Sequence, residues 1–269
     1  MDQDLRPVGP PRQVGAPPEE APATDGKAGP TVARTMGVFV GRQREMGELQ
    51  AALEVALSGQ GRLVMLAGEP GIGKTRTAQE LIAYATVRGA QVLWGRCHAA
   101  EGAPPYWPWV QVIRSYIHGR DPEELRSQMG AGAADVAEVV LELKEVLPDL
   151  GPPPALEPQQ ARFRLFDSIT GFFKRASQSQ PLMVVLDNLH WADRPSLQLL
   201  EFLAQEMAES RLLLLGTYRD QPERGHREMT IGIDVFRDPA QLHLHRMLVQ
   251  PFLMEAGNYP INRRDWKKD

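Results

Sequence analysis

The sequence has few cysteines, few aromatic residues and no strong excess of charge. Its single cysteine, Cys97, excludes an internal disulfide and suits a reducing compartment. A small buried hydrophobe is a commoner role for such a residue than a reactive thiol. The formal net charge of −4 over 269 residues gives no broad positive field. That balance argues against nucleic acid or an anionic membrane as the main partner.

Long apolar runs are absent as well. No run approaches the ~18 residues of a membrane span. The first residues, MDQDLRPVGPPRQ, lack the apolar core of a signal peptide. Hydrophobic residues still make up 42% of the chain, which is ample for a globular core. We therefore expect a folded, cytoplasmic protein.

Composition divides the chain into three parts. Residues 1–36 are rich in Pro, Ala and Gly without apolar periodicity, so we expect a disordered leader there. Residues 37–220 alternate strand-like and helix-like apolar patterns and form the expected core. Residues 221–269 form an irregular tail in which Thr230–Phe236 is the one candidate for an extra strand.

The apolar pattern of the core predicts buried strands alternating with helices. The strands are expected at 62–67, 91–95, 182–186 and 211–216. The helices are expected at 42–57, from the glycine-rich turn to 89, from about 109, around 136–143, at 162–176 and from 195. The apolar positions of helix 162–176 are expected to be Phe163, Phe166, Ile169 and Phe173. Such alternation predicts an α/β fold, with a parallel sheet and helices on both faces.

The segment GEPGIGKT, residues 68–75, fits the phosphate-binding pattern G-x-x-x-x-G-K-[ST]. Glycines let the backbone curl with its N–H groups toward phosphate, and the following helix adds its positive N-terminal end. Lys74 is expected to reach the β- and γ-phosphates, and the Thr75 hydroxyl to bind Mg²⁺. A chance glycine turn is the weaker interpretation, because an apolar strand precedes the segment and an amphipathic helix follows it. The predicted cofactor-binding residues here are Gly68, Glu69, Pro70, Gly71, Ile72, Gly73, Lys74, Thr75 and Arg76.

Asp187 directly follows the apolar run LMVVL, where the second half of a P-loop site is expected. A carboxylate at the end of a buried strand can hold the Mg²⁺ shell, usually through water. Such an aspartate can also be a helix cap or a turn residue, but its pairing with a P-loop favours the metal role. We therefore predict ATP and Mg²⁺ as ligands, with Thr75 and Asp187 on the metal.

Five segments occur in an order that resembles a known family. They are FVGRQREMGEL, the P-loop, GRCHAAEGAPPYWPW, LDNLHWAD and LLLLGTYRD. Over about residues 38–220 the chain resembles the AAA/STAND-type ATPase domain of bacterial LuxR-family transcriptional regulators and of AAA-containing adenylate cyclases. The resemblance implies a P-loop NTPase sheet of the AAA/ASCE type. In that sheet the strand ending at Tyr218 lies between the P-loop strand and the Asp187 strand.

The resemblance also implies roles for residues outside the P-loop. Val40, Gly41 and Arg42 would lie near the adenine and ribose. Arg219 would sense the γ-phosphate, although an ordinary surface arginine remains an open interpretation.

Aromatic residues and one histidine of the family segments have a simpler interpretation. For His190 and Trp191 we favour a packing role over chemistry. Tyr106, Trp107 and Trp109 are expected to form a packed aromatic cluster.

The sequence departs from the family pattern at two places. The family usually has a second acid after the Mg²⁺ aspartate, whereas this chain has Asn188. An amide cannot accept a proton, but it can position water by hydrogen bonding. We therefore name Lys74, Asp187, Asn188 and Arg219 as catalytic candidates and expect weak or absent hydrolysis. The second departure follows residue 220, where the fifth strand and helical lid of the family are not recognisable, so we expect the fold to stop before the lid.

Three functions remain open. The favoured one is a signalling ATPase module that binds ATP and Mg²⁺ and acts as a nucleotide-dependent switch. Its output would come from a protein partner or self-association, without direct nucleic acid or membrane binding. A nucleotide-binding remnant without a catalytic cycle is the second. A small P-loop kinase is the third, and it is disfavoured because only Arg224 and Arg227 follow the core closely enough for an Arg-rich lid.

Overall fold

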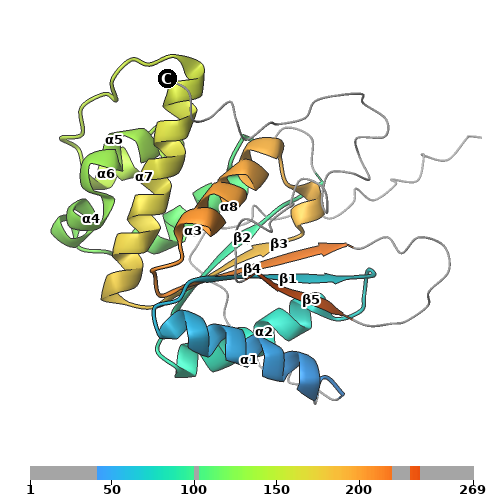
Figure 1. Ribbon diagram of the computed structural model, residues 1–269. Coiled ribbons are helices and arrows are strands. Elements are labelled where there is room, and N and C mark those ends of the chain that lie inside the picture. Colours follow the sequence, from blue (N-terminus) through green and yellow to red (C-terminus); the bar gives the residue numbers. More distant parts are fainter. Residues whose placement is uncertain (1–40, 100–102, 220–230, 237–269) are drawn as a thin grey trace, which may run out of the picture. The chain divides into compact units, whose positions relative to one another are not determined.

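A five-stranded sheet lies at the centre of the computed structural model, which describes residues 41–99, 103–219 and 231–236 (Figure 1). Its strands are β1 (Arg62–Gly68), β2 (Gln91–Arg96), β3 (Leu182–Asp187), β4 (Leu212–Arg219) and β5 (Gly232–Phe236). They lie in the order β2-β3-β4-β1-β5, and the first four are parallel. The predicted position of β4 between the P-loop strand and the Asp187 strand is confirmed, as is the α/β fold of the P-loop NTPase type.

The outer neighbour of β1 is β5, which runs antiparallel to it. Leu63 lies opposite Phe236, and Ala67 lies opposite Gly232. This strand falls within the segment that the sequence offered as a candidate strand. Because β4 and β5 flank β1, the strand that leads into the P-loop has hydrogen-bonding partners on both sides.

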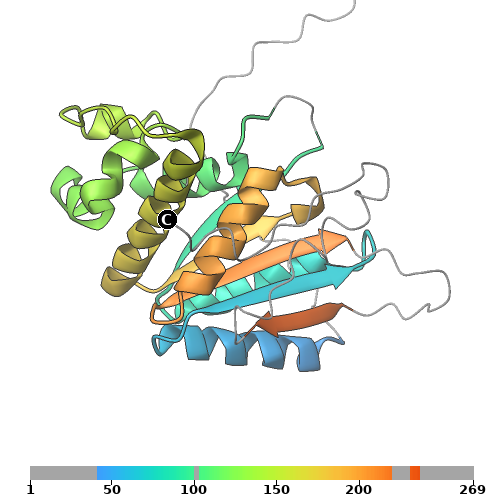
Figure 2. The same cartoon turned by 45° about the horizontal axis from the view of Figure 1, so that its top comes forward.

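The helices form a layer on each face of the sheet (Figures 1 and 2). One layer contains α1 (Gln43–Leu57) and α2 (Lys74–Val87). The other contains α3 (Trp107–Ile117), α7 (Pro158–Ser179) and α8 (Arg194–Glu206). Alternate residues of each strand enter the two cores, so Val64 packs with α1 and α2 while Met65 packs with α3, α7 and α8. The continuous apolar runs of the sequence reflect this burial on both faces.

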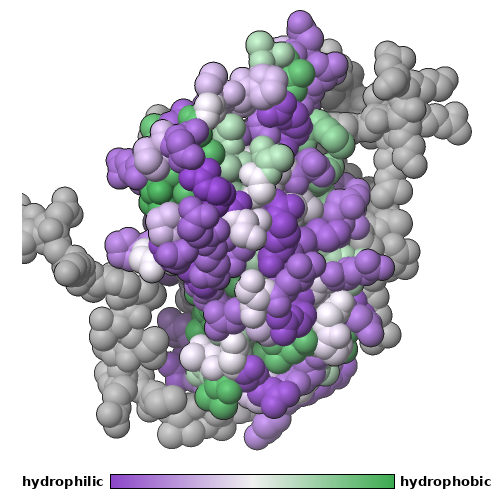
Figure 3. Space-filling view, turned by 90° about the vertical axis from the view of Figure 1, so that its left-hand side faces the viewer, coloured by the Kyte–Doolittle hydropathy of each residue, from purple (hydrophilic) through white to green (hydrophobic). Residues whose placement is uncertain are grey.

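A group of short elements packs against α7 beyond the sheet. They are α4 (Pro122–Met129), η1 (Gly130–Gly132), α5 (Ala133–Val136) and α6 (Leu143–Val146). The face of the molecule on this side is mostly hydrophilic, and its hydrophobic side chains lie in small groups (Figure 3). None of the helices in the described ranges is long and apolar enough to cross a membrane.

The single helix that we predicted around residues 136–143 is wrong. α5 ends at Val136, a turn follows, and α6 begins at Leu143. Val136, Val140 and Leu143 are nevertheless fully buried. The apolar spacing therefore identified the inward side chains, while packing against α7 determined the backbone between them.

The buried face of α7 differs in part from the expected one. Phe163 is 46% exposed and packs edge-on against Phe202. Phe172, which the sequence did not single out, is fully buried and contacts Tyr116. The long helix touches α4, α5 and α8 along its length, which widens its apolar strip beyond a single row of residues.

The aromatic cluster after β2 packs as predicted. Trp109 is 1% exposed, and its ring centre lies 6.0 Å from that of Phe173. Its indole N–H donates to the carbonyl oxygen of Ser196 at 3.0 Å. Tyr106 meets Phe166 edge-on at 6.0 Å, and Trp107 packs against the same core. These contacts join the GRCHAAEGAPPYWPW segment to the start of α8.

The outer divisions of the chain fall largely outside the described ranges. The expected leader, residues 1–36, lies outside them, and so does the expected tail except for residues 231–236. These domain boundaries stay predictions.

Candidate functional site

The loop between β1 and α2 holds the predicted P-loop. Gly71 and Gly73 have φ angles of 80° and 102°, a left-handed conformation that side chains with a Cβ rarely adopt. Gly73 also precedes the first residue of α2 and supplies no side-chain cap. The first amide groups of α2 are therefore free of a competing cap and suit an anionic ligand.

Lys74 begins α2 and is 9% exposed. Its ammonium donates to the carbonyl oxygens of Gly68 at 2.7 Å and Glu69 at 3.0 Å, so it lies across the P-loop. Burial lowers the pKa of Lys74, and the positive charge of Arg219 lowers it further, while Asp187 opposes both. Two cations that disfavour each other in this way make a site that an anion would stabilise.

The remaining P-loop residues differ in their surroundings. Glu69 and Pro70 are exposed, Ile72 and Thr75 are half-buried, and Arg76 pairs with Glu80 one turn further along α2. The Arg76 guanidinium is thus paired with a carboxylate of the same helix. The binding roles of these residues stay predictions.

Asp187 ends β3 and is 2% exposed. One carboxylate oxygen accepts from the Thr217 hydroxyl at 2.6 Å, and the other pairs with Arg96 Nε at 3.3 Å. Thr217 Oγ1 in turn accepts from the Asn188 N–H at 3.0 Å. These bonds fix the side chain of Asp187 and the backbone of Asn188 to β4.

Sequence reasoning did not single out Thr217 or Arg96. A hydroxyl inside the apolar run LLLLGTYR was a usable signal for Thr217. Arg96 gave no such signal, because it meets Asp187 only through the register of β2 on β3.

Asn188 turns the chain sharply after β3. Its φ of 62° and ψ of 43° lie in the left-handed region, which Asn tolerates better than most residues. The turn leads into η2 (Leu189–Trp191), whose Leu189 lies directly over β4. A Cβ at Gly216 would come within 2.6 Å of the Leu189 side chain, so glycine is needed there for η2 to approach the sheet.

Arg219 and the side chains of η2 lie at the same edge of the sheet. Arg219 is the last residue of β4, and its guanidinium carbon lies 5.9 Å from the ring centre of Trp191. Trp191 is 42% exposed, so the packing role that we favoured for it does not describe its surroundings.

His190 is the second residue of η2. Both of its ring nitrogens are buried, and neither has a hydrogen-bond partner among the described residues. Burial, followed by the charges of Arg219 and Lys74, lowers the pKa of His190 to about 4. We call Lys74, Asp187, Asn188, His190 and Arg219 the P-loop cluster.

The start of α1 also reaches the P-loop. Arg42 precedes α1 and donates to the carbonyl oxygen of Ile72 at 2.8 Å, and it pairs with Glu45 at 3.4 Å. Gly41, with a φ of 89°, makes the turn before it. Val40 lies outside the described residues. The structure therefore brings Arg42 to the P-loop, while its role toward a base stays a prediction.

The residues present fit a Mg²⁺ ion held jointly with phosphate. Within the described ranges, no group of three or more His, Cys, Asp or Glu could hold a metal ion. Mg²⁺ commonly keeps several waters and uses one or two carboxylates with substrate phosphates. A buried carboxylate at Asp187 and a hydroxyl at Thr75 meet that requirement.

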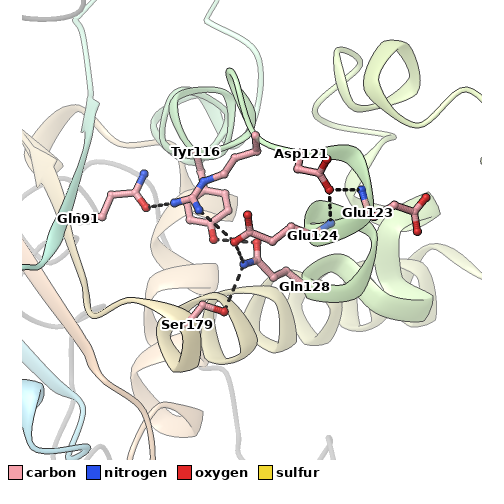
Figure 4. Close-up of polar contacts among 8 residues, drawn as sticks. Gln91, Tyr116, Asp121, Glu123, Glu124, Gln128 and Ser179 are labelled. Atoms are coloured by element: carbon pink, nitrogen blue, oxygen red, sulfur yellow. Dashed lines mark hydrogen bonds and ion pairs between the residues drawn. The ribbon is translucent and has the colours of Figure 1, made fainter.

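A second polar cluster lies at the opposite end of β2 (Figure 4). Arg120 bonds to Gln91 and Glu124, Glu124 accepts from Gln128, and Gln128 accepts from the Tyr116 hydroxyl at 2.7 Å. We call these five residues the Gln91 cluster. These side chains are hydrogen-bond partners of one another, which is typical of a network that stabilises the fold.

Comparison with known proteins gives one family and two similar chains. A family model described as AAA ATPase domain matches residues 38–215. An uncharacterized protein of Rhizobium meliloti (strain 1021) is 23% identical over 201 residues, which are 69% of this chain and 19% of that protein. The chain thus spans about a fifth of that relative's length. A chain from a structure of Drosophila ORC bound to DNA matches with a TM-score of 0.35 and 14% identity, over 68% of this chain and 82% of that one.

Proposed function

The chain belongs to the AAA ATPase domain family, and from that premise we propose that it binds ATP with Mg²⁺ and acts as a nucleotide-dependent switch in signalling. We further propose that hydrolysis is weak or absent. The context that we propose is that of the ATPase domains of LuxR-family regulators and AAA-containing adenylate cyclases. The output would then be carried by a protein partner or by self-association.

The convergence of Lys74, Asp187 and Arg219 supports this proposal most strongly. They come from α2, β3 and β4, at the carboxyl-terminal edge of the parallel strands (Figure 1). Lys74 responds to both of the other charges, because after burial, which lowers its pKa most, Arg219 lowers the pKa of Lys74 further and Asp187 opposes the shift. In open α/β sheets this edge is where ligands bind.

Each residue has a defined part in this proposal. The backbone N–H groups of the P-loop and the start of α2 would receive phosphate oxygens. Lys74 would exchange its two carbonyl partners for phosphate oxygens, and Asp187 would hold the metal shell through water. Bound Mg²⁺ would supply charge neutralisation of the phosphates.

The proposal of weak hydrolysis depends on Asn188. Its amide has no basicity with which to take a proton from water. A general base typically contributes about 10²–10⁴-fold to a rate. We infer that the bound nucleotide persists long enough to define a state of the molecule.

A switch requires a difference in free energy between the ATP and ADP states. A ligand shifts a conformational equilibrium only by its differential affinity for the two states. The γ-phosphate is the difference between the two nucleotides, so the residues that contact it must carry the discrimination. Arg219, which now lies over Trp191 in an exposed position, has room to change partners.

Thermal unfolding of the full chain tests the proposal. Mg·ATP at about 100 times its dissociation constant is expected to add roughly 2.7 kcal/mol to the free energy of unfolding. Lys74→Ala should abolish that gain, and Lys144→Ala, a change at an exposed lysine, should preserve it. A larger gain with Mg·ATP than with Mg·ADP supports the switch, and Mg·GTP reports on base preference. If no nucleotide moves the transition of the native chain, the chain is a remnant without a working site.

A further inference from the structure

His190 lies beside the other residues of the P-loop cluster, and its buried ring nitrogens have no hydrogen-bond partners among the described residues. It follows β3 by three residues, on η2, which packs against β4. Its two ring nitrogens are buried, and neither finds a partner among the described residues. A buried polar atom without a partner costs about 1–3 kcal/mol, so a purely structural residue here would be unfavourable.

Packing alone does not explain the imidazole. The aromatic neighbour of the ring is Trp191, at a ring separation of 5.2 Å. A leucine or phenylalanine would fill the same space without two unmet nitrogens. The ring is therefore better explained by a ligand that completes its hydrogen bonds.

The charges around the ring indicate what kind of ligand this is. Arg219 and Lys74 act on His190 as cations, and Asp187 acts as the anion. Burial, and after it the two cations, keeps the imidazole neutral, so one ring nitrogen carries a proton and the other a lone pair. The protonated ring nitrogen can then donate a hydrogen bond to an anion, which the two nearby cations would also attract.

We propose that His190 is a discriminating residue of the nucleotide site, which donates a ring N–H to an oxygen of the terminal phosphate of a nucleoside triphosphate. This inference rests on the proposed function, because it assigns a residue to the same site. A nucleoside diphosphate lacks the terminal phosphate and leaves His190 without that bond. The ring would thus form its hydrogen bond in the triphosphate state only.

The acidity of the ring fits a donor better than a base. With a pKa near 4, the imidazole is neutral at physiological pH but accepts a proton poorly. His190 would therefore not replace the acid that is missing at position 188. Its part is to make the triphosphate state more stable than the diphosphate state.

The test compares nucleotide affinities of full-length variants, measured by calorimetry with Mg²⁺. The ligands are a non-hydrolysable ATP analogue and ADP, and the variants are His190→Leu, His190→Asn, His190→Gln and the control His118→Leu. His118 is an exposed histidine at the end of α3. A hydrogen bond to a charged group contributes about 1.5–3 kcal/mol, so His190→Leu should weaken the analogue about ten- to hundredfold. ADP affinity should stay within about twofold, and His118→Leu should change neither.

The amide variants identify the nitrogen that donates. An asparagine amide reaches about as far as Nδ1 and a glutamine amide about as far as Nε2. We expect one of the two to recover most of the analogue affinity. Recovery by neither, with equal losses for both nucleotides, would overturn the inference.

The unfolding temperature without nucleotide gives a second measurement, for which a ligand-binding role and a packing role of His190 predict different results. Because the ring nitrogens have no described partner, His190→Leu should unfold at the same temperature as the native chain or higher. A lower unfolding temperature with an unchanged ratio of analogue to ADP affinity would show a packing residue and overturn the inference alone. Failure of the native chain to bind either nucleotide would overturn the proposed function, and the inference with it.

Discussion

The P-loop cluster and the Gln91 cluster lie at opposite ends of β2 and β3, and they differ in how their polar groups are satisfied. In the Gln91 cluster, Tyr116, Gln128 and Glu124 bond to one another and to Arg120. In the P-loop cluster, the Lys74 ammonium bonds to carbonyl oxygens of its own loop, and the ring nitrogens of His190 have no hydrogen-bond partner among the described residues. The first cluster is complete in itself, whereas the second has bonding capacity for a ligand.

The difference shows that buried polar residues alone do not identify a functional site. Both clusters contain buried polar side chains and a nearby arginine. The two clusters differ in their balance of charges and in how many of their polar groups have hydrogen-bond partners. Stabilising networks pair their polar groups, whereas binding sites keep some of them unpaired. Variants in the two clusters should therefore affect different measurements.

The largest expected effect is a gain of hydrolysis in Asn188→Asp. A carboxylate at this position can accept a proton from water, so phosphate release should rise by about 10²-fold or more. Aspartate tolerates the left-handed backbone of residue 188, and ATP affinity should change little. Asn188→Gly, which fits the same backbone without a polar group, should give no gain. Equal rates in both variants would show that residue 188 does not govern the reaction.

A loss of stability without a loss of binding is expected in the Gln91 cluster. Gln128→Ala leaves the buried Tyr116 hydroxyl without its acceptor and should lower the free energy of unfolding by about 1–3 kcal/mol. Urea unfolding measures this, and Mg·ATP should still stabilise the variant as it does the native chain. Glu123→Gln, a change at an exposed residue of α4, is the matched control. A variant that is as stable as the native chain but binds no nucleotide would reverse the assignment of the two clusters.

The pH dependence of stability should contain a contribution from His190. Its pKa is lowered in the folded chain, so the unfolded chain binds the proton more tightly. This contribution to stability is present above about pH 6.5, the ordinary value, and is lost as the pH falls toward 4. The native chain should therefore lose free energy of unfolding between pH 7 and pH 5, as measured by urea unfolding. His190→Gln should lose less, because the substituted side chain does not titrate. If the variant loses as much free energy of unfolding as the native chain, the His190 ring is solvated in the folded chain and its pKa is not lowered.

The smallest expected effect concerns Cys97, which follows the last residue of β2. Burial, with smaller effects of Asp193 and Asp187, raises the pKa of its thiol to about 12. Iodoacetamide at pH 8 should therefore label the unfolded chain readily and the native chain hardly at all, as followed by mass spectrometry. The Cys97 N–H donates to the backbone of Asp187 at 2.9 Å, so residual labelling reports opening beside the P-loop cluster. Mg·ATP is expected to slow the labelling of Cys97 in the native chain. Fast labelling of the native chain would show that the Cys97 thiol is not buried.

Sequence reasoning recovered those features that local pattern encodes. The apolar runs identified β1 to β4, and GEPGIGKT identified the P-loop segment. The position of β4 came from family resemblance, since periodicity does not determine strand order. Helix 136–143 failed because the same apolar spacing fits a helix and two turns, and packing against α7 decided between them.

The parts of the candidate site that were missed depend on contacts between distant segments. Arg96 meets Asp187 because β2 and β3 are in register, and Thr217 meets both Asp187 and Asn188 from β4. His190 was interpreted as a packing residue, because the lack of partners for its nitrogens is visible only in three dimensions. Which side chains lack partners is a property of the folded chain.

The left-handed backbone at residue 188 has an evolutionary consequence. At a φ of 62° the position accepts glycine, asparagine or aspartate with little strain and disfavours β-branched residues. Asparagine and aspartate codons differ by a single base, and their side chains have nearly the same size. A single base change can therefore exchange the amide for a carboxylate at this position while the turn after β3 keeps its backbone conformation.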